Sequence, residues 1–111
     1  MADSPDWPQI LALYDGLLQY EPTPVVALNR AVALAETGQQ AAALAQMTSL
    51  AEALDNYQPF HAAHADVLAA LGRAPESLAA FSRAIALAAS SSDAAFLANR
   101  RDKLLKSQAT P

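Results

Sequence analysis

Residues 31–38 read AVALAETG and residues 65–72 read ADVLAALG, so that a similar order of small and apolar residues ends twice in glycine. Gly38 and Gly72 lie 34 residues apart, and residues before them match at the same offset. The matched pairs are Ala31 with Ala65 and Leu34 with Leu68. Alanine and leucine lose little on entering a helix, and glycine suits the left-handed residue that closes one. The two stretches therefore predict two equivalent helices, each ending at a glycine.

The correspondence continues beyond each glycine into a second predicted helix. Ala43 matches Ser77, Met47 matches Phe81 and Leu50 matches Ala84. Small residues let two helices of a hairpin approach closely, and larger ones fill the space between hairpins. A period of about 34 residues is that of the tetratricopeptide repeat (TPR). We therefore expect an all-α, TPR-like right-handed helical-hairpin solenoid of about six antiparallel helices. The alternative is an alanine-rich bundle whose matches arise by chance.

Start and stop signals divide the chain into six predicted helices. Their positions are after Asp6, from Thr23-Pro24 to Thr37, from about Gln39 to Ala53, from the polar stretch 55–59 to Leu71, onward from Pro75-Glu76, and from the loop 90–93 past Leu105. Aspartate, threonine and serine before a helix accept hydrogen bonds from its first N–H groups, and proline is tolerated there. The sequence thus predicts a TPR-like domain over residues 6–106. Residues 1–5 are interpreted as a linker or an added start, and residues 107–111 as a tail.

Composition narrows the class of protein. The chain has 111 residues, of which 53% are hydrophobic, and a net charge of -4, which indicates one globular domain and not a disordered segment. It has no cysteine and no uncharged run of about 18 residues, so no disulfide framework and no membrane span are expected. An acidic chain without a basic patch is not expected to bind nucleic acid. Without a recognisable secretion signal, the cytoplasm is the expected location.

A set of residues spread along the chain is distinctive. These are Asp6-Trp7, Ile10, Leu13-Tyr14, Leu17-Leu18, Pro22, Pro24-Val25-Val26-Ala27-Leu28-Asn29-Arg30-Ala31-Val32-Ala33, His61-Ala62-Ala63, Ala65-Asp66, Leu68 and Leu71-Gly72-Arg73. With them the chain resembles, from Asp6 to about Leu104, the C-terminal TPR-like extension of a group of bacterial extracytoplasmic-function (ECF) sigma factors of the sigma-70 family. His64 departs from that pattern, in which arginine is more common. No part of the chain resembles the sigma regions themselves.

The resemblance implies a regulatory domain that modulates sigma-dependent transcription initiation through protein contacts, and not an enzyme. The implied partner is a protein: the sigma regions of its own parent chain, the RNA polymerase core or a signalling protein. No cofactor is implied. The alternative from a different class is a free-standing TPR scaffold or oligomerisation module unrelated to transcription.

The first helices of TPR units line the concave face, so we expect a partner to contact that face. The predicted contact residues are Val25, Leu28, Asn29, Val32, Ala62 and Asp66. An asparagine such as Asn29 can hold a peptide amide through both its donor and its acceptor. Neither first helix contains lysine, which argues against a site that clamps a C-terminal carboxylate.

Three further polar residues are predicted to tie helices together. Arg30 interrupts an apolar helix and needs a partner, for which Asp66, Asp15 and Glu21 are the candidates. His61 and His64 lie three residues apart and are expected to fill space between helices and to form local hydrogen bonds. A ligand or metal site made of these histidines with Asp66 is a weaker alternative, because the chain offers no other histidine or cysteine.

The first predicted helix carries an apolar stripe that includes Trp7, Ile10 and Tyr14. In repeat register it is the second helix of a hairpin, and the chain contains no matching first helix to cover it. An uncovered apolar stripe favours self-association, so a homodimer through this N-terminal helix is expected.

Overall fold

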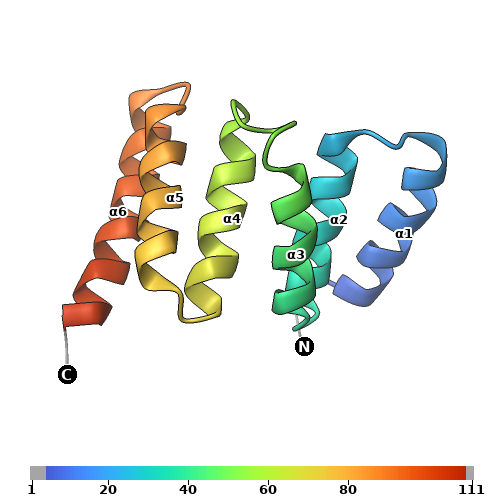
Figure 1. Cartoon of the computed structure of the whole chain (residues 1–111), viewed down its shortest axis with the longest axis horizontal. Coiled ribbons are helices and arrows are strands. Elements are labelled where there is room, and N and C mark those ends of the chain that lie inside the picture. Colours follow the sequence, from blue (N-terminus) through green and yellow to red (C-terminus); the bar gives the residue numbers. More distant parts are fainter. Residues whose placement is uncertain (1–4, 110–111) are drawn as a thin grey trace. The chain divides into compact units, whose positions relative to one another are not determined.

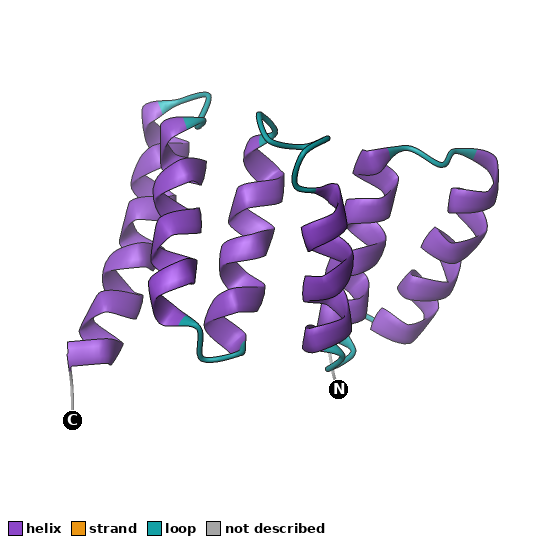
Figure 2. Cartoon of the chain, viewed as in Figure 1, coloured by secondary structure: helices purple, strands orange, loops and turns teal. Residues whose placement is uncertain are grey.

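The computed structural model describes residues 5–109 and contains six helices and no strand in that part of the chain (Figures 1 and 2). The helices are α1 (Trp7–Tyr20), α2 (Pro24–Glu36), α3 (Gln40–Leu50), α4 (Gln58–Ala70), α5 (Ala74–Ala86) and α6 (Ser91–Ala109). The chain divides into two compact units, the first ending at Leu54 and the second beginning at Asp55. Within the first unit α2 packs against α1 and α3, and within the second α5 packs against α4 and α6. The prediction of an all-α chain of six helices is confirmed.

Three predicted boundaries differ from the observed ones by more than one residue. The loop expected at residues 90–93 is shorter, because α6 begins at Ser91. The third helix was expected to reach Ala53, but α3 ends at Leu50 and residues 51–56 form turns. The hydroxyl groups of Thr48 and Ser49 in the last turn donate to the carbonyl oxygens of Leu44 and Gln46, and such bonds compete with a regular helix end. At the other end of the chain α6 continues to Ala109, so residues 107–109 of the predicted tail are helical. Residues 1–4 and 110–111, which belong to the predicted linker and tail, lie outside the described residues.

Local capping explains where the first two helices begin. The Asp6 carboxylate accepts a hydrogen bond from the Gln9 N–H at 3.2 Å, and the Thr23 hydroxyl accepts one from the Val26 N–H at 3.2 Å. These bonds satisfy donors that have no partner inside the helix. Pro24 follows Thr23 at the first helical position, where the missing N–H costs nothing.

The two glycines of the repeat have the backbone conformation that the sequence predicts. Gly38 has φ of +98° and Gly72 has φ of +75°, a region that L-residues avoid. After each glycine the next N–H donates back to the equivalent leucine carbonyl, Gln39 to Leu34 at 3.3 Å and Arg73 to Leu68 at 2.9 Å. This is the hydrogen bond of a glycine-closed helix end. The same local geometry therefore closes α2 and α4.

Residues at matched repeat positions are buried in both units. The core members among them are Ala31, Leu34, Ala43 and Met47 in the first unit and Ala65, Leu68, Ser77, Phe81 and Ala84 in the second. The fully buried Ser77 hydroxyl donates to the Ala65 carbonyl oxygen at 2.7 Å, which joins α5 to α4. Small residues at the hairpin contact and a large one beside it are the packing that the period predicts.

In the part of the chain that the structure describes, no helix has the length and apolar character that a membrane crossing requires.

Candidate functional site

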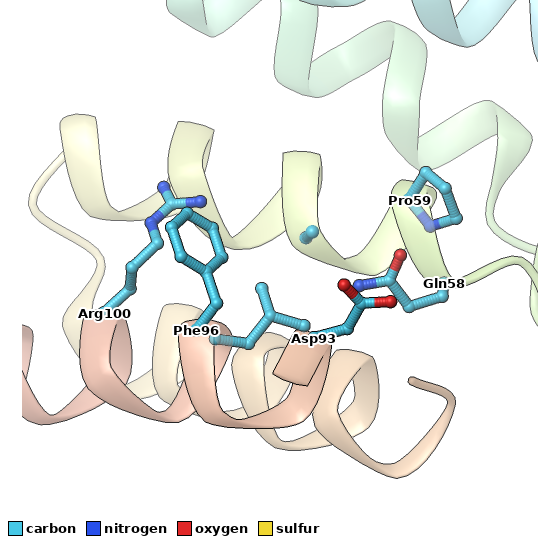
Figure 3. A pocket seen from close by; sticks show the side chains of 7 residues that line it. Gln58, Pro59, Asp93, Phe96 and Arg100 are labelled. Atoms are coloured by element: carbon cyan, nitrogen blue, oxygen red, sulfur yellow. The ribbon is translucent and has the colours of Figure 1, made fainter. Parts of the chain in front are cut away.

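A pocket of about 290 Å³ lies in the second unit between α4 and α6 (Figure 3). Its lining residues are Gln58, Pro59, Ala62, Asp93, Phe96, Leu97 and Arg100. The first three belong to α4 and the others to α6. We call it the α4–α6 pocket.

The middle of the α4–α6 pocket is apolar. Its apolar lining residues include Ala62, Leu97, which is 3% exposed, and Phe96, which is 62% exposed. Phenylalanine is one of the residues that folding most strongly removes from water. Burial of the exposed Phe96 ring by a further apolar side chain would therefore be favourable.

Arg100 closes one end of the pocket. Its guanidinium pairs with the carboxylate of Asp66 on α4, and its central carbon lies 5.5 Å from the ring centre of Phe81 and 5.7 Å from that of Phe96. Both ring distances are in the range of cation–π attraction. Figure 3 shows the Arg100 side chain alongside the Phe96 ring. These contacts hold Phe96 and Arg100 together on α6. The positive charge of Arg100 is paired with a negative charge of the same chain.

Asp93 and Gln58 form the opposite end. Both lie in the first turn of a helix, Gln58 in α4 and Asp93 in α6, and in Figure 3 their side chains point toward one another. The Asp93 N–H donates to the Ser90 hydroxyl at 3.1 Å, which fixes this turn. The pocket is thus apolar in the middle and polar at both ends, an arrangement typical of sites that bind a side chain and orient it.

The predicted contact residues fall into two sets. Ala62 lines the pocket and Asp66 holds its Arg100, so both belong to the site in the second unit. Four others lie on α2 in the first unit: Val25 and Asn29 are exposed, Val32 is half-buried and Leu28 is 2% exposed. Leu28 is therefore a core residue, whose side chain is not open to a partner.

Sequence reasoning missed most of the lining of the α4–α6 pocket, although the repeat carried the signal. Each of the four predicted contact positions in α2 has an equivalent 34 residues later in α4 and 68 residues later in α6. The equivalents in α6 of Val25, Leu28, Asn29 and Val32 are, in that order, Asp93, Phe96, Leu97 and Arg100. All four members from α6 line the pocket. The pairs matched in the sequence end at Ala84, so the register was not extended to α6. Extending the 34-residue register to it would have placed Phe96 and Arg100 at the site.

The first of the three predicted polar ties, Arg30, does join two helices. It pairs with Asp15, one of its three candidate partners, and so links α2 to α1. Asp66 pairs instead with Arg100 inside the second unit.

The two histidines are partly buried and contact Phe60. The Nε2 atom of His61 lies 2.7 Å from the Asp55 carbonyl oxygen, and the ring meets Phe60 edge-on with centres 5.1 Å apart. Burial lowers the pKa of the His64 imidazole below 6.5, and the neighbouring His61 lowers it further. Both effects favour the neutral form of the His64 imidazole. Within residues 5–109 no three histidine or acidic side chains come together as metal ligands.

Comparisons with known proteins address the fold. No protein-family model matches the chain. It is 44% identical over 105 residues to an uncharacterized protein of Rhizobium meliloti (strain 1021), and it spans about a quarter (25%) of that relative's length. Among solved structures it is similar to the first TPR domain of Spaghetti (RPAP3) bound to the HSP90 peptide SRMEEVD. The TM-score is 0.78 at 18% identity, over 94% of this chain and 81% of the other. The chain therefore has the TPR-like helical-hairpin fold.

Proposed function

We propose that the chain is a protein-interaction module and that a segment of a partner protein binds in the α4–α6 pocket. The observation that carries the proposal is the exposed Phe96 ring beside an apolar pocket on first-helix positions of the repeat. A peptide bound to the TPR domain of similar fold supports it. Aromatic residues in pockets supply much of the free energy of protein association.

The finer proposal concerns the partner. The resemblance to the C-terminal extension of ECF sigma factors supports a role in transcription initiation, with the sigma regions, the RNA polymerase core or a signalling protein as the partner. The relative from Rhizobium meliloti, which is about four times longer than the matched region, is consistent with a domain that acts within a longer bacterial chain. Occupancy of the pocket would then bias whether the sigma regions are free to bind polymerase. The module binds by shape and performs no chemical step.

Photo-crosslinking from the pocket tests both levels of this proposal. Phe96 is replaced by p-benzoylphenylalanine, the protein is irradiated in the cells that produce it, and the crosslinked proteins are identified by mass spectrometry. The matched control carries the same probe at Leu105, which is also on α6 and exposed but does not line the pocket. Products specific to position 96 are expected, and sigma or polymerase subunits among them would support the finer proposal.

Other outcomes separate the two levels. A specific product with a protein outside transcription would remove the sigma-factor role and keep the interaction module. Equal products from positions 96 and 105, or none from either, would contradict the interaction proposal itself.

A second candidate function is self-association through α1. No residue of α1 is buried, and Leu13 and Tyr20 are 66% and 85% exposed on a stripe that also contains Leu17. Trp7, Ile10 and Tyr14, which the sequence analysis singled out, are half-buried, so other residues of the helix provide the open surface. Light scattering of the native chain should then give a dimer, and the double variant Leu13→Glu, Tyr20→Glu a monomer. A monomeric native chain at all concentrations would remove this candidate.

A further inference from the structure

The two charged residues that line the α4–α6 pocket differ in whether a partner can pair with them. Its lining contains one cation, Arg100, and one anion, Asp93. Arg100 is already paired with Asp66 and rests near two aromatic rings. An acidic group from a partner that approached Arg100 would lie beside the Asp66 carboxylate already paired with it, and two like charges so close repel each other. Arg100 is therefore a poor receptor for an acidic partner.

Asp93 is available in a way that Arg100 is not. Its side chain is exposed, and in the described part of the chain no lysine, arginine or histidine pairs with it. With Arg100 and Asp66 cancelling, the carboxylate of Asp93 gives the pocket a net negative charge. A cation placed at that end would gain attraction without breaking an existing ion pair.

The N-termini of α4 and α6 lie at this same end and carry partial positive charge. Several of their first-turn donors are already occupied or missing. The Asp93 N–H donates to the Ser90 hydroxyl, the Phe60 N–H donates to the Tyr57 carbonyl oxygen at 3.0 Å, and Pro59 has no N–H. The remaining N–H groups offer an anion only partial charges, whereas the Asp93 carboxylate presents a full negative charge to the pocket.

The apolar part of the pocket sets the other requirement. Ala62, Phe96 and Leu97 are the apolar members of the lining of this pocket, whose whole volume of about 290 Å³ is large enough for a leucine, methionine or aromatic side chain. Such a side chain would cover the exposed face of Phe96. Asp93 lines the same pocket, at the end opposite Arg100 (Figure 3), so a basic side chain next to the apolar residue of a bound segment could pair with it.

From these features we infer that the α4–α6 pocket selects partner segments that carry a large apolar residue next to a lysine or arginine, and discriminates against acidic segments. The inference deepens the proposed function and rests on it. Phe96 supplies most of the affinity, and Asp93 supplies the preference for a cation.

Peptide selection tests the inference without knowledge of the natural partner. The full chain is immobilised, and a phage-displayed library of random peptides is selected against the native chain, Phe96→Ala and Asp93→Asn at low salt, where charge pairs are least screened. Asp102→Asn is the matched control, because Asp102 is an exposed acid on α6 outside the pocket lining. Circular dichroism verifies that every variant keeps the helical content of the native chain.

The expected result is a set of peptides in which a large apolar residue adjoins lysine or arginine. Their recovery depends on Phe96, and the dissociation constant of a synthetic copy rises about two- to fivefold on Asp93→Asn, the range of an exposed ion pair. Asp102→Asn leaves that constant unchanged. Asp93→Lys should reverse the preference and recover peptides rich in aspartate and glutamate.

Two contrary results have different meanings. Peptides that require Phe96 but show no enrichment in basic residues, or that bind Asp93→Asn as well as the native chain, would overturn the charge selectivity and leave the interaction module in place. If no recovered peptide required Phe96, the pocket would not be a binding site, and the proposed function would fall with the inference.

Discussion

Replacing Gly38 by alanine is expected to destabilise the first unit, although the new methyl group would touch nothing. A Cβ atom built at Gly38 has no heavy atom within 4 Å, so the cost comes from the backbone alone. At φ of +98° an L-residue is strained by about 1–2 kcal/mol relative to a right-handed conformation. Alanine also lowers the conformational entropy of the unfolded chain, which raises the free energy of unfolding by about 0.4–1 kcal/mol. The net loss of unfolding free energy is therefore expected to be about 1 kcal/mol, or about 4–8 °C in Tm.

Gly16 provides a matched control in the same unit. It lies within α1 with φ in the ordinary range, and a Cβ built there also has no heavy atom within 4 Å. Gly16→Ala should instead stabilise, by up to about 1 kcal/mol, because glycine is a poor helix former. Urea titrations followed by far-UV circular dichroism give both free energies. Equal effects of the two substitutions, or a Gly38→Ala variant as stable as the native chain, would refute the assignment of Gly38 as the left-handed end of α2.

Three further predictions follow from single contacts. Ser77→Ala removes the buried hydrogen bond to the Ala65 carbonyl and should lower the unfolding free energy by about 1 kcal/mol in a urea titration, whereas a change below the error of the measurement would show that the bond contributes nothing. Because the folded pKa of His64 lies below its unfolded value of 6.5, its contribution to stability is complete above that pH and is lost as the pH falls through the lowered pKa. His64→Gln should therefore flatten the decline in Tm between about pH 7 and pH 5, and an unchanged pH profile would contradict a lowered pKa of the half-buried His64. Arg30→Gln removes the exposed pair with Asp15 and should cost less than about 1 kcal/mol in a chemical titration, so a larger loss would mean that the arginine does more than tie α2 to α1.

Helix ends and the repeat could be read from the sequence because they depend on local chemistry. Asp6, Thr23 and Pro24 act on backbone groups within a few residues, and Gly38 and Gly72 are required by their own φ angles. Each signal is complete within one turn of helix. Neighbouring helices have little influence on it.

Partners and burial were harder to predict because they depend on tertiary packing. Arg30 had three acidic candidates, and only the packing of α2 against α1 selects Asp15. Leu28 was expected to face a partner but is buried, whereas Phe96, an apolar residue at the equivalent position of the repeat, is exposed. An apolar residue on a helix can face the core or a pocket, and the sequence alone does not say which face a neighbour covers.

The affinity of the partner found by crosslinking tests most directly whether the α4–α6 pocket is the binding site. The dissociation constant should be measured by calorimetry for the native chain, Phe96→Ala and Leu105→Ala. Both residues are exposed on α6, so both variants should fold, but only Phe96 lines the pocket. The account predicts at least about a tenfold loss of affinity for Phe96→Ala, as for an aromatic residue central to an interface, and less than about a twofold loss for Leu105→Ala. Equal affinities for the two variants would contradict it.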